Sequence, residues 1–152
     1  MERRTIFEAA GGRDAFLRLA AAHHRRCLAD PVLSHPFSHP GHPQHLERLA
    51  GYWGEVFGGP PLYSEAAGGQ SAMLAIHAQT QAEPDLGDRF LACFVGALDE
   101  AGLPDDAALR DAMRSYMEWA VGQVMAYSPA DAVVPPALPV PRWSWSGLQP
   151  TD

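Results

Sequence analysis

Glycine and proline breaks divide this sequence into segments of helical length. They fall at Gly11-Gly12, Asp30-Pro31, Gly58-Gly59-Pro60-Pro61, Gly68-Gly69 and Gly102-Leu103-Pro104. Between the breaks, apolar residues recur three or four positions apart, as on the buried face of an amphipathic helix. We find no convincing strand. The pattern predicts an all-α domain, although helix bundles, repressor-like folds and globins share it.

The expected helices can be given by residue range. A capping box at Thr5 and Glu8 predicts a short first helix, and residues 13–29 a longer second one. Residues 44–57 carry an apolar stripe that ends at the Gly-Gly-Pro break. A short segment follows in which Met73 and His77 share one face. The last two helices are expected to run from residue 86 to Gly102 and from the acidic pair at 105–106 through residue 124.

Prolines mark two irregular segments. Residues 34–43 contain three prolines and are expected to form a compact corner. After Ser128 the composition shifts again, so the chain divides into a helical domain, 1–128, and an extended tail, 129–152. Because the tail is unusually apolar, we expect it to pack on the helical domain. We expect Trp143 and Trp145 to face the same side, with at least one buried, and the site around His77 not to depend on the tail.

Composition excludes several classes of function. The 152 residues suffice for one domain, and the formal net charge is −7 with no lysine. An acidic chain without a basic face is not expected to bind nucleic acid or an anionic membrane. No apolar run approaches the roughly 20 residues of a membrane helix, and the first residues lack a signal-peptide pattern. Cys27 and Cys93 are typical of reduced, buried thiols, so we expect a cytoplasmic protein.

Histidine is the residue type in this chain that is best suited to bind a metal or to transfer a proton. The sequence contains seven, and His77 has no histidine or carboxylate at a metal-binding spacing such as i+4. A lone histidine on a helix is usually a surface residue or a satisfied buried one. Three others, at 35, 39 and 42, lie in the proline-rich corner without a cysteine or carboxylate at a suitable spacing for zinc.

The order of three motifs resembles the second group of truncated haemoglobins. These are Gly58-Gly59-Pro60-Pro61-Leu62-Tyr63-Ser64, then His77, then Phe90-Leu91-Ala92-Cys93. The His- and Pro-rich stretch from Ser34 to Leu49 and the ending Trp143–Leu148 are similar to an actinobacterial branch of that family. The resemblance covers Thr5 to Leu148. It implies a two-over-two helical sandwich that binds one haem b, with His77 as the proximal ligand of the iron.

The resemblance also implies which residues lie on the distal side of the haem, where a ligand binds. His45 falls at the position of the distal residue, and His24 where the family usually has a tyrosine. Phe90 replaces a tryptophan and offers no hydrogen-bond donor. We therefore expect His24 and His45 to contact the bound ligand, with either of them able to ligate iron directly. The residues expected to line the haem are Phe37, Leu49, Tyr52, Met73, Phe90 and Phe94.

Three classes of function stay open at this point. The resemblance implies reversible binding or transport of O₂, or binding of NO, CO or peroxide, by a monomer or homodimer. It equally allows a haem enzyme, either a peroxidase or a nitric oxide dioxygenase served by a reductase. The third class is a helical interaction protein without haem, whose histidines are structural.

Overall fold

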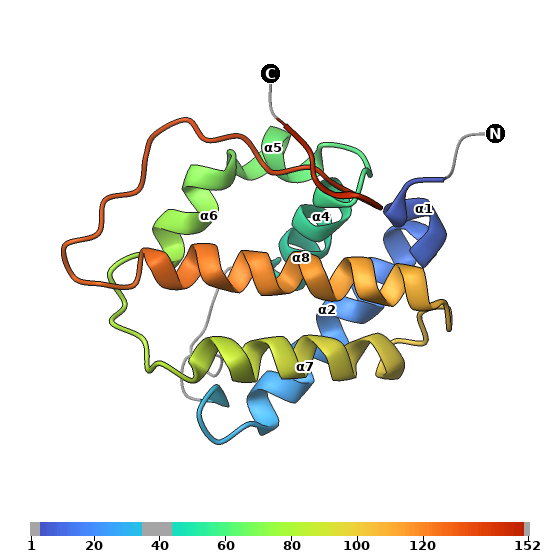
Figure 1. Cartoon of the computed structure of the whole chain (residues 1–152), viewed down its shortest axis with the longest axis horizontal. Coiled ribbons are helices and arrows are strands. Elements are labelled where there is room, and N and C mark those ends of the chain that lie inside the picture. The colour runs from blue at the N-terminus through green and yellow to red at the C-terminus, as the bar shows by residue number, and fades with distance from the viewer. Residues whose placement is uncertain (1–3, 35–43, 151–152) are drawn as a thin grey trace.

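The computed structural model describes residues 4–34 and 44–150 (Figure 1). Residues 35–43 of the proline-rich corner, with Phe37, lie outside these ranges. The described residues form seven α-helices and one two-stranded antiparallel sheet. They are α1 (Ile6–Ala10), α2 (Gly12–Ala29), α4 (His45–Val56), α5 (Leu62–Ala67), α6 (Gln70–His77), α7 (Leu86–Glu100) and α8 (Ala107–Ala126), with β1 (Trp143–Ser144) paired to β2 (Gly147–Leu148).

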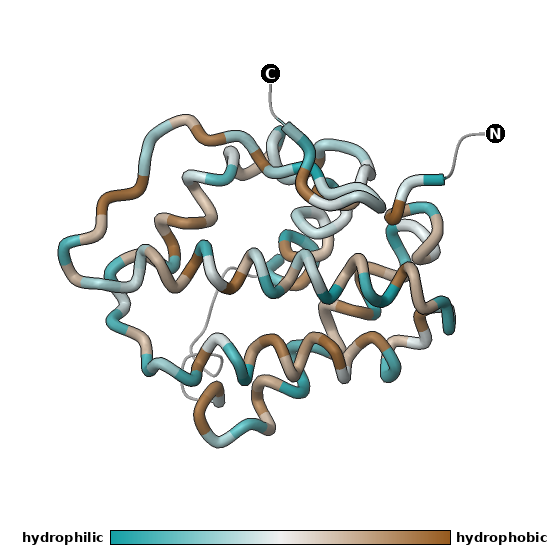
Figure 2. The backbone as a smooth tube through the Cα atoms, in the orientation of Figure 1, coloured by the Kyte–Doolittle hydropathy of each residue, from teal (hydrophilic) through white to brown (hydrophobic). Residues whose placement is uncertain are grey.

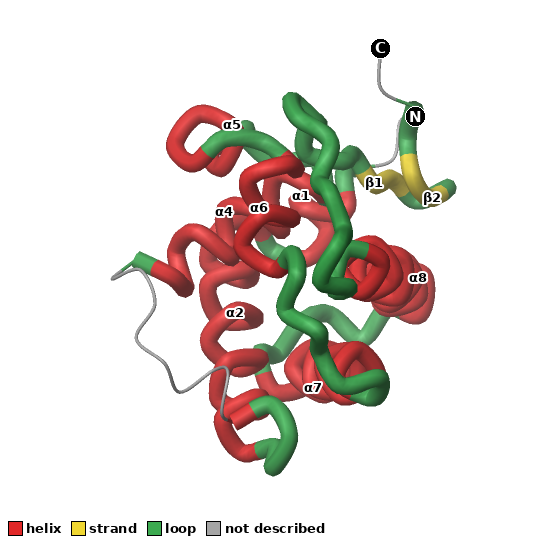
Figure 3. The backbone as a smooth tube through the Cα atoms, turned by 90° about the vertical axis from the view of Figure 1, so that its left-hand side faces the viewer, coloured by secondary structure: helices red, strands yellow, loops and turns green. Residues whose placement is uncertain are grey.

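The four longest helices form two layers. α2 packs on α4, α7 packs on α8, and the α2–α4 pair lies against the α7–α8 pair (Figure 3). The short helix α6 lies beside these layers, at the end of the molecule where α7 begins (Figures 1 and 3). This arrangement confirms the predicted all-α fold and its two-over-two sandwich.

The core lies between the two layers. Hydrophobic stretches of α7 and α8 alternate with polar ones, as amphipathic helices require (Figure 2). The largest fully buried side chains are Phe16, Phe57, Phe94, Tyr116, Ile6, Leu19, Leu33, Leu74, Leu98, Leu109, Met113 and Met117. Most of them come from the stripes that the sequence shows at helical spacing.

Local capping residues set the helix ends. The Thr5 hydroxyl accepts from the Glu8 amide at 3.1 Å and donates to the Glu8 carboxylate at 3.2 Å, so Thr5 caps the first helix. Gly11 adopts a left-handed φ of 119° and ends α1. The Asp106 carboxylate accepts from the Leu109 amide at 3.0 Å and caps α8.

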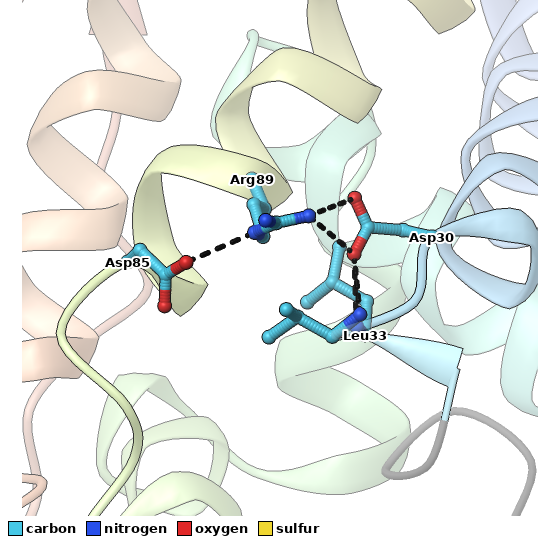
Figure 4. Close-up of polar contacts among 5 residues, drawn as sticks. Asp30, Leu33, Asp85 and Arg89 are labelled. Atoms are coloured by element: carbon cyan, nitrogen blue, oxygen red, sulfur yellow. Dashed lines mark hydrogen bonds and ion pairs between the residues drawn. The ribbon is translucent and has the colours of Figure 1, made fainter.

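An arginine joins the end of α2 to the start of α7 (Figure 4). Arg89 donates from Nη1 to the Asp30 carboxylate at 3.3 Å and from Nε to Asp85 at 3.0 Å. Asp30 also accepts from the amides of Val32 at 2.8 Å and Leu33 at 3.1 Å. Partial desolvation opposes ionisation of Asp30, but these amides and the Arg89 charge outweigh it and keep its pKa below the usual value. This contact fixes α7, which carries Phe90, against α2, which carries His24.

The C-terminal residues differ from the expected extended tail. β1 and β2 form a hairpin, which the sequence analysis did not predict. Trp143 and Trp145 are both half-buried, and the buried tail side chains are Val140 and Pro141. Trp143 packs on Tyr116 of α8, whereas the Trp145 indole donates to the Arg4 carbonyl at 2.6 Å. The two indoles have different partners because the turn at 145–146 interrupts the extended backbone that the prediction assumed.

Candidate functional site

Two helical faces meet at the site. On α4, His45, Leu49 and Tyr52 follow one another at i, i+4 and i+7, and on α6 Gln70, Met73 and His77 follow at i, i+3 and i+7. These spacings place each set on one side of its helix.

A buried hydrogen bond joins the two faces at one end. The Tyr52 hydroxyl donates to Gln70 Oε1 at 2.5 Å, and both side chains are buried. Burial raises the pKa of the Tyr52 phenol, so it remains a hydrogen-bond donor. This contact fixes the helix that carries His45 relative to the helix that carries His77.

Three histidines lie toward the other end. His45 and His77 are exposed, and the ring centroids of His45 and His24 lie 5.8 Å apart. Partial burial lowers the pKa of His45, and the charges of His24 and His77 lower it further. His45 of α4 is therefore within electrostatic reach of His24 on α2 and of His77 on α6. The fold brings the rings of His24 and His45 into contact, and it places His77 on the helix that the Tyr52–Gln70 hydrogen bond joins to α4.

The imidazole of His77 has a defined tautomer. Its Nδ1 lies 2.9 Å from the carbonyl oxygen of Met73, one turn earlier in α6. A carbonyl can only accept a hydrogen bond, so Nδ1 carries the proton and Nε2 keeps a free lone pair. A neutral imidazole oriented in this way is suited to bind a metal through Nε2. A haem needs one such protein ligand, because its porphyrin supplies four nitrogens. The donor chemistry of His77 therefore fits haem.

His23 is a buried histidine that the sequence analysis did not select. It is 0% exposed, its ring centroid lies 4.4 Å from that of Phe90, and its Nε2 lies 3.4 Å from the Phe90 carbonyl. Burial lowers its pKa to about 4, so the ring is neutral near pH 7. The Cys27 Sγ, one turn along α2, lies 3.5 Å from His23 Nε2. His23 thus packs against the ring of Phe90 inside the fold, whereas the ring of His24 lies next to that of His45.

The remaining predicted pocket residues differ in their surroundings. Leu49, Met73 and Phe90 are half-buried at the edge of the core. Phe94 is fully buried, and its ring centroid lies 5.1 Å from that of Trp53. Among the described residues, no group of three or more histidine, cysteine or carboxylate side chains could hold a metal ion.

The C-terminal segment holds α6 at its N-terminal end. The Gln70 amide donates to the Leu138 carbonyl at 2.8 Å. Ser71 Oγ donates to the Pro135 carbonyl at 2.6 Å and accepts from the Leu138 amide at 2.8 Å.

The end of α8 and the tail together hold the chain just after α6. Gln79 donates from its backbone amide to the Tyr127 carbonyl at 2.8 Å and from Nε2 to the Ala132 carbonyl at 2.9 Å. The tail therefore contacts the first turn of the helix that carries His77 through Pro135 and Leu138, and the loop after that helix through Ala132.

These features are typical of a haem-binding globin. The helices form two layers, His77 on the short helix α6 can bind a metal, and α4 carries a second histidine, His45. The family model for bacterial-like globins matches residues 5–125, and the chain belongs to this family. Comparison with curated proteins finds no match.

Solved haemoglobin structures are similar over most of this chain. The haemoglobin of Chloroflexus aurantiacus is 31% identical with a TM-score of 0.68, covering 80% of this chain and 98% of its own. The haemoglobin of the actinobacterium Thermobifida fusca is 29% identical with a TM-score of 0.67, covering 80% and 96%. The group II 2-on-2 haemoglobin of Agrobacterium tumefaciens is 25% identical with a TM-score of 0.69, covering 82% and 95%.

These comparisons confirm the resemblance to group II truncated haemoglobins. As a globin, the protein uses a haem cofactor to bind diatomic ligands such as O₂. In the described ranges, no helix is long and apolar enough to cross a membrane.

Proposed function

We propose that this globin holds haem b through His77 Nε2 and reversibly binds O₂, NO or CO on the opposite side. The observation that carries the proposal is the hydrogen bond from His77 Nδ1 to the Met73 carbonyl at 2.9 Å. This bond assigns the proton to Nδ1 and leaves Nε2 to bind iron. A proximal histidine in globins has this arrangement of donor and ligand atoms.

Non-covalent attachment, as for haem b, agrees with the cysteines. Attachment of haem through cysteine thioethers needs a C-x-x-C-H motif, and Cys27 and Cys93 are distant in sequence, free and buried. The porphyrin would contact the predicted lining, which comprises Phe37, Leu49, Tyr52, Met73, Phe90 and Phe94. Reduced thiols also agree with a cytoplasmic location.

His24 and His45 would provide the polar contacts to the bound ligand. Haem supplies the iron atom on which a diatomic gas binds. Phe90 has no donor, whereas a neutral imidazole has one N–H donor and one acceptor nitrogen. The lowered pKa of His45 favours this neutral form near pH 7. An N–H directed at the ligand would stabilise the partial negative charge on bound O₂.

Peroxide reduction is the second candidate function. It is favoured by the pair formed by His24 and His45, whose ring centroids are 5.8 Å apart. A neutral imidazole can accept a proton from peroxide on one side of the O–O bond and return it to the other oxygen. The same two side chains would thus serve either ligand binding or proton transfer.

Absorption spectroscopy of the purified chain tests the proposal. We expect an intense Soret band after addition of haem, and further spectra that change reversibly when O₂ or CO is added to the reduced protein. A chain that shows no Soret band with excess haem would contradict haem binding. A Soret band that does not respond to O₂, CO or NO would contradict the proposed ligand chemistry.

A further inference from the structure

Cys27 of α2 and Cys93 of α7 lie together where these two helices pack. Both thiols are free, Cys27 is 0% exposed and Cys93 is 9% exposed. With Leu33 they form one buried cluster, against which Leu86 and Phe90 pack. The proposed haem site uses neither thiol.

A contact one helical turn from each cysteine holds α2 on α7. Asp30 lies three residues after Cys27, and Arg89 lies four residues before Cys93. These two side chains form the ion pair between the helices, with Arg89 Nη1 3.3 Å from the Asp30 carboxylate (Figure 4). The ion pair therefore fixes the two helices against each other beside the thiols.

The interface is also tight on the other side of Cys93. A Cβ added to Gly96, three residues after Cys93, would lie 2.4 Å from Nη1 of Arg26, the residue before Cys27. Contacts between the helices thus lie on both sides of Cys93. Helices packed so closely bring two short side chains from the same buried cluster within reach of a disulfide.

We propose that Cys27 and Cys93 are a peroxide-sensitive pair, which hydrogen peroxide oxidises to a disulfide that joins α2 to α7. Because α2 carries His24 and α7 carries Phe90, this bond fastens together two helices beside the proposed ligand pocket. The thiol chemistry does not depend on haem. Only its consequence for the pocket rests on the proposed function.

His23 supplies a base beside Cys27. Its Nε2 lies 3.4 Å from the Phe90 carbonyl, which can only accept, so Nε2 carries the proton and Nδ1 is the basic nitrogen. His23 Nδ1 lies 3.8 Å from Cys27 Sγ, within range of an S–H···N hydrogen bond. Burial raises the pKa of both thiols, so the pair stays reduced until an oxidant reaches it.

The oxidation balances in two steps. Cys93, the more exposed thiol, attacks one peroxide oxygen, the O–O bond breaks, and a sulfenic acid and one water form. Cys27 then attacks the Cys93 sulfur while its proton passes to His23 Nδ1. The S–O bond breaks, and the leaving hydroxide takes this proton as a second water. Two thiols lose two electrons in all, and one peroxide gains them.

Peptide mapping by mass spectrometry tests the bond. The full haem-loaded chain, with CO on the reduced iron to keep peroxide from the haem, is treated with hydrogen peroxide, alkylated without reduction and digested. We expect a peptide cross-linked through Cys27 and Cys93 of one chain, which a thiol reductant separates. Cysteines that stay alkylated, or are oxidised without forming this peptide, would overturn the proposal. If no Soret band forms, the haem function fails instead, and the same mapping of the haem-free chain decides the thiol chemistry.

Thermal melts test whether the bond joins the two helices in the native fold. A disulfide between residues 27 and 93 restricts the unfolded chain, so peroxide treatment should raise the melting temperature by roughly 10 °C. Cys27→Ser is the matched control, since serine is similar in size and cannot form the bond, and it should show no rise. An unchanged melting temperature in the parent, or an equal rise in Cys27→Ser, would contradict the proposal.

His23→Phe tests the base, because phenylalanine keeps a ring but has no nitrogen. Cys93 should form its sulfenic acid at the parental rate, whereas the disulfide should form at least about tenfold more slowly. Dimedone, which traps sulfenic acids, should therefore label Cys93 more strongly in this variant than in the parent. A folded His23→Phe protein that forms the disulfide at the parental rate would show that His23 is not the base and overturn this step.

Discussion

The backbone amide of Gln70 donates to the carbonyl of Leu138 at 2.8 Å, so the C-terminal segment caps the helix that carries His77. The approach is close. A Cβ added to the preceding residue, Gly69, would lie 2.5 Å from the Leu138 oxygen. The absence of a side chain at position 69 therefore allows the tail to reach α6.

Replacing Gly69 by alanine should displace the tail from α6. The steric conflict involves a backbone oxygen that cannot move alone, and we expect a loss of about 1–3 kcal/mol in the free energy of unfolding. Gly122→Ala is the control, since a Cβ at that position of α8 has no atom within 4 Å. It should be neutral or stabilise by up to about 1 kcal/mol. Equal stability of the two variants in urea unfolding would contradict this account of the contact.

Truncation after Ser128 should both lower the melting temperature and weaken haem retention. The deletion removes the bonds from Leu138, Pro135 and Ala132 to α6 and its following loop, together with the buried Val140. Transfer of haem to an acceptor apoprotein measures retention, and differential scanning calorimetry measures stability. A truncated chain that loses haem at the rate of the full chain would show that α6 does not depend on the tail.

Acid should destabilise the fold through His23. A histidine in the unfolded chain binds its proton near pH 6.5, but folded His23 does so only near pH 4. Between these values the unfolded chain holds more protons, so stability falls as pH decreases from 6.5 to 4. The loss attributable to His23 is on the order of 3 kcal/mol. Urea unfolding of the parent and of His23→Leu across this range provides the test, because the leucine variant lacks this loss. Parallel pH profiles for the two proteins would contradict it.

The helices could be predicted from the sequence, because their signals are local. Gly11 and Asp106 act on their own helix ends, and the Gly-Gly-Pro break at residue 58 ends α4. The hairpin could not, because two-residue strands leave no alternating pattern. Gln70 was not predicted either, since its importance depends on Tyr52, 18 residues earlier in the chain.

The roles of the candidate site residues were only partly accessible from the sequence. His23 and His24 are adjacent, and which of them is buried depends on the rotation of α2 in the fold. Helical spacing shows that they diverge by about 100° but not which one faces the core. The hydrogen bond between His77 and Met73 follows from their four-residue spacing, and the contact between His24 and His45 required the packing of α2 on α4.

Removing a distal histidine should speed the release of O₂. A hydrogen bond to the partly negative ligand is worth about 1.5–3 kcal/mol, so dissociation should accelerate at least about tenfold in His24→Leu or His45→Leu. Glutamine at the same positions keeps an N–H donor and should stay closer to the parent. Stopped-flow measurement of O₂ dissociation gives these rates. If both leucine variants match the parent, the donor to the ligand is another group or water.

The absorption spectrum of His77→Gly tests the central claim most directly. Removing the imidazole leaves space for free imidazole, which can take its place as the ligand. We predict that this variant purifies without a Soret band, that added imidazole with haem restores it, and that His45→Gly retains haem without imidazole. A His77→Gly protein that retains haem with the spectrum of the parent would contradict the assignment of His77 as the proximal ligand.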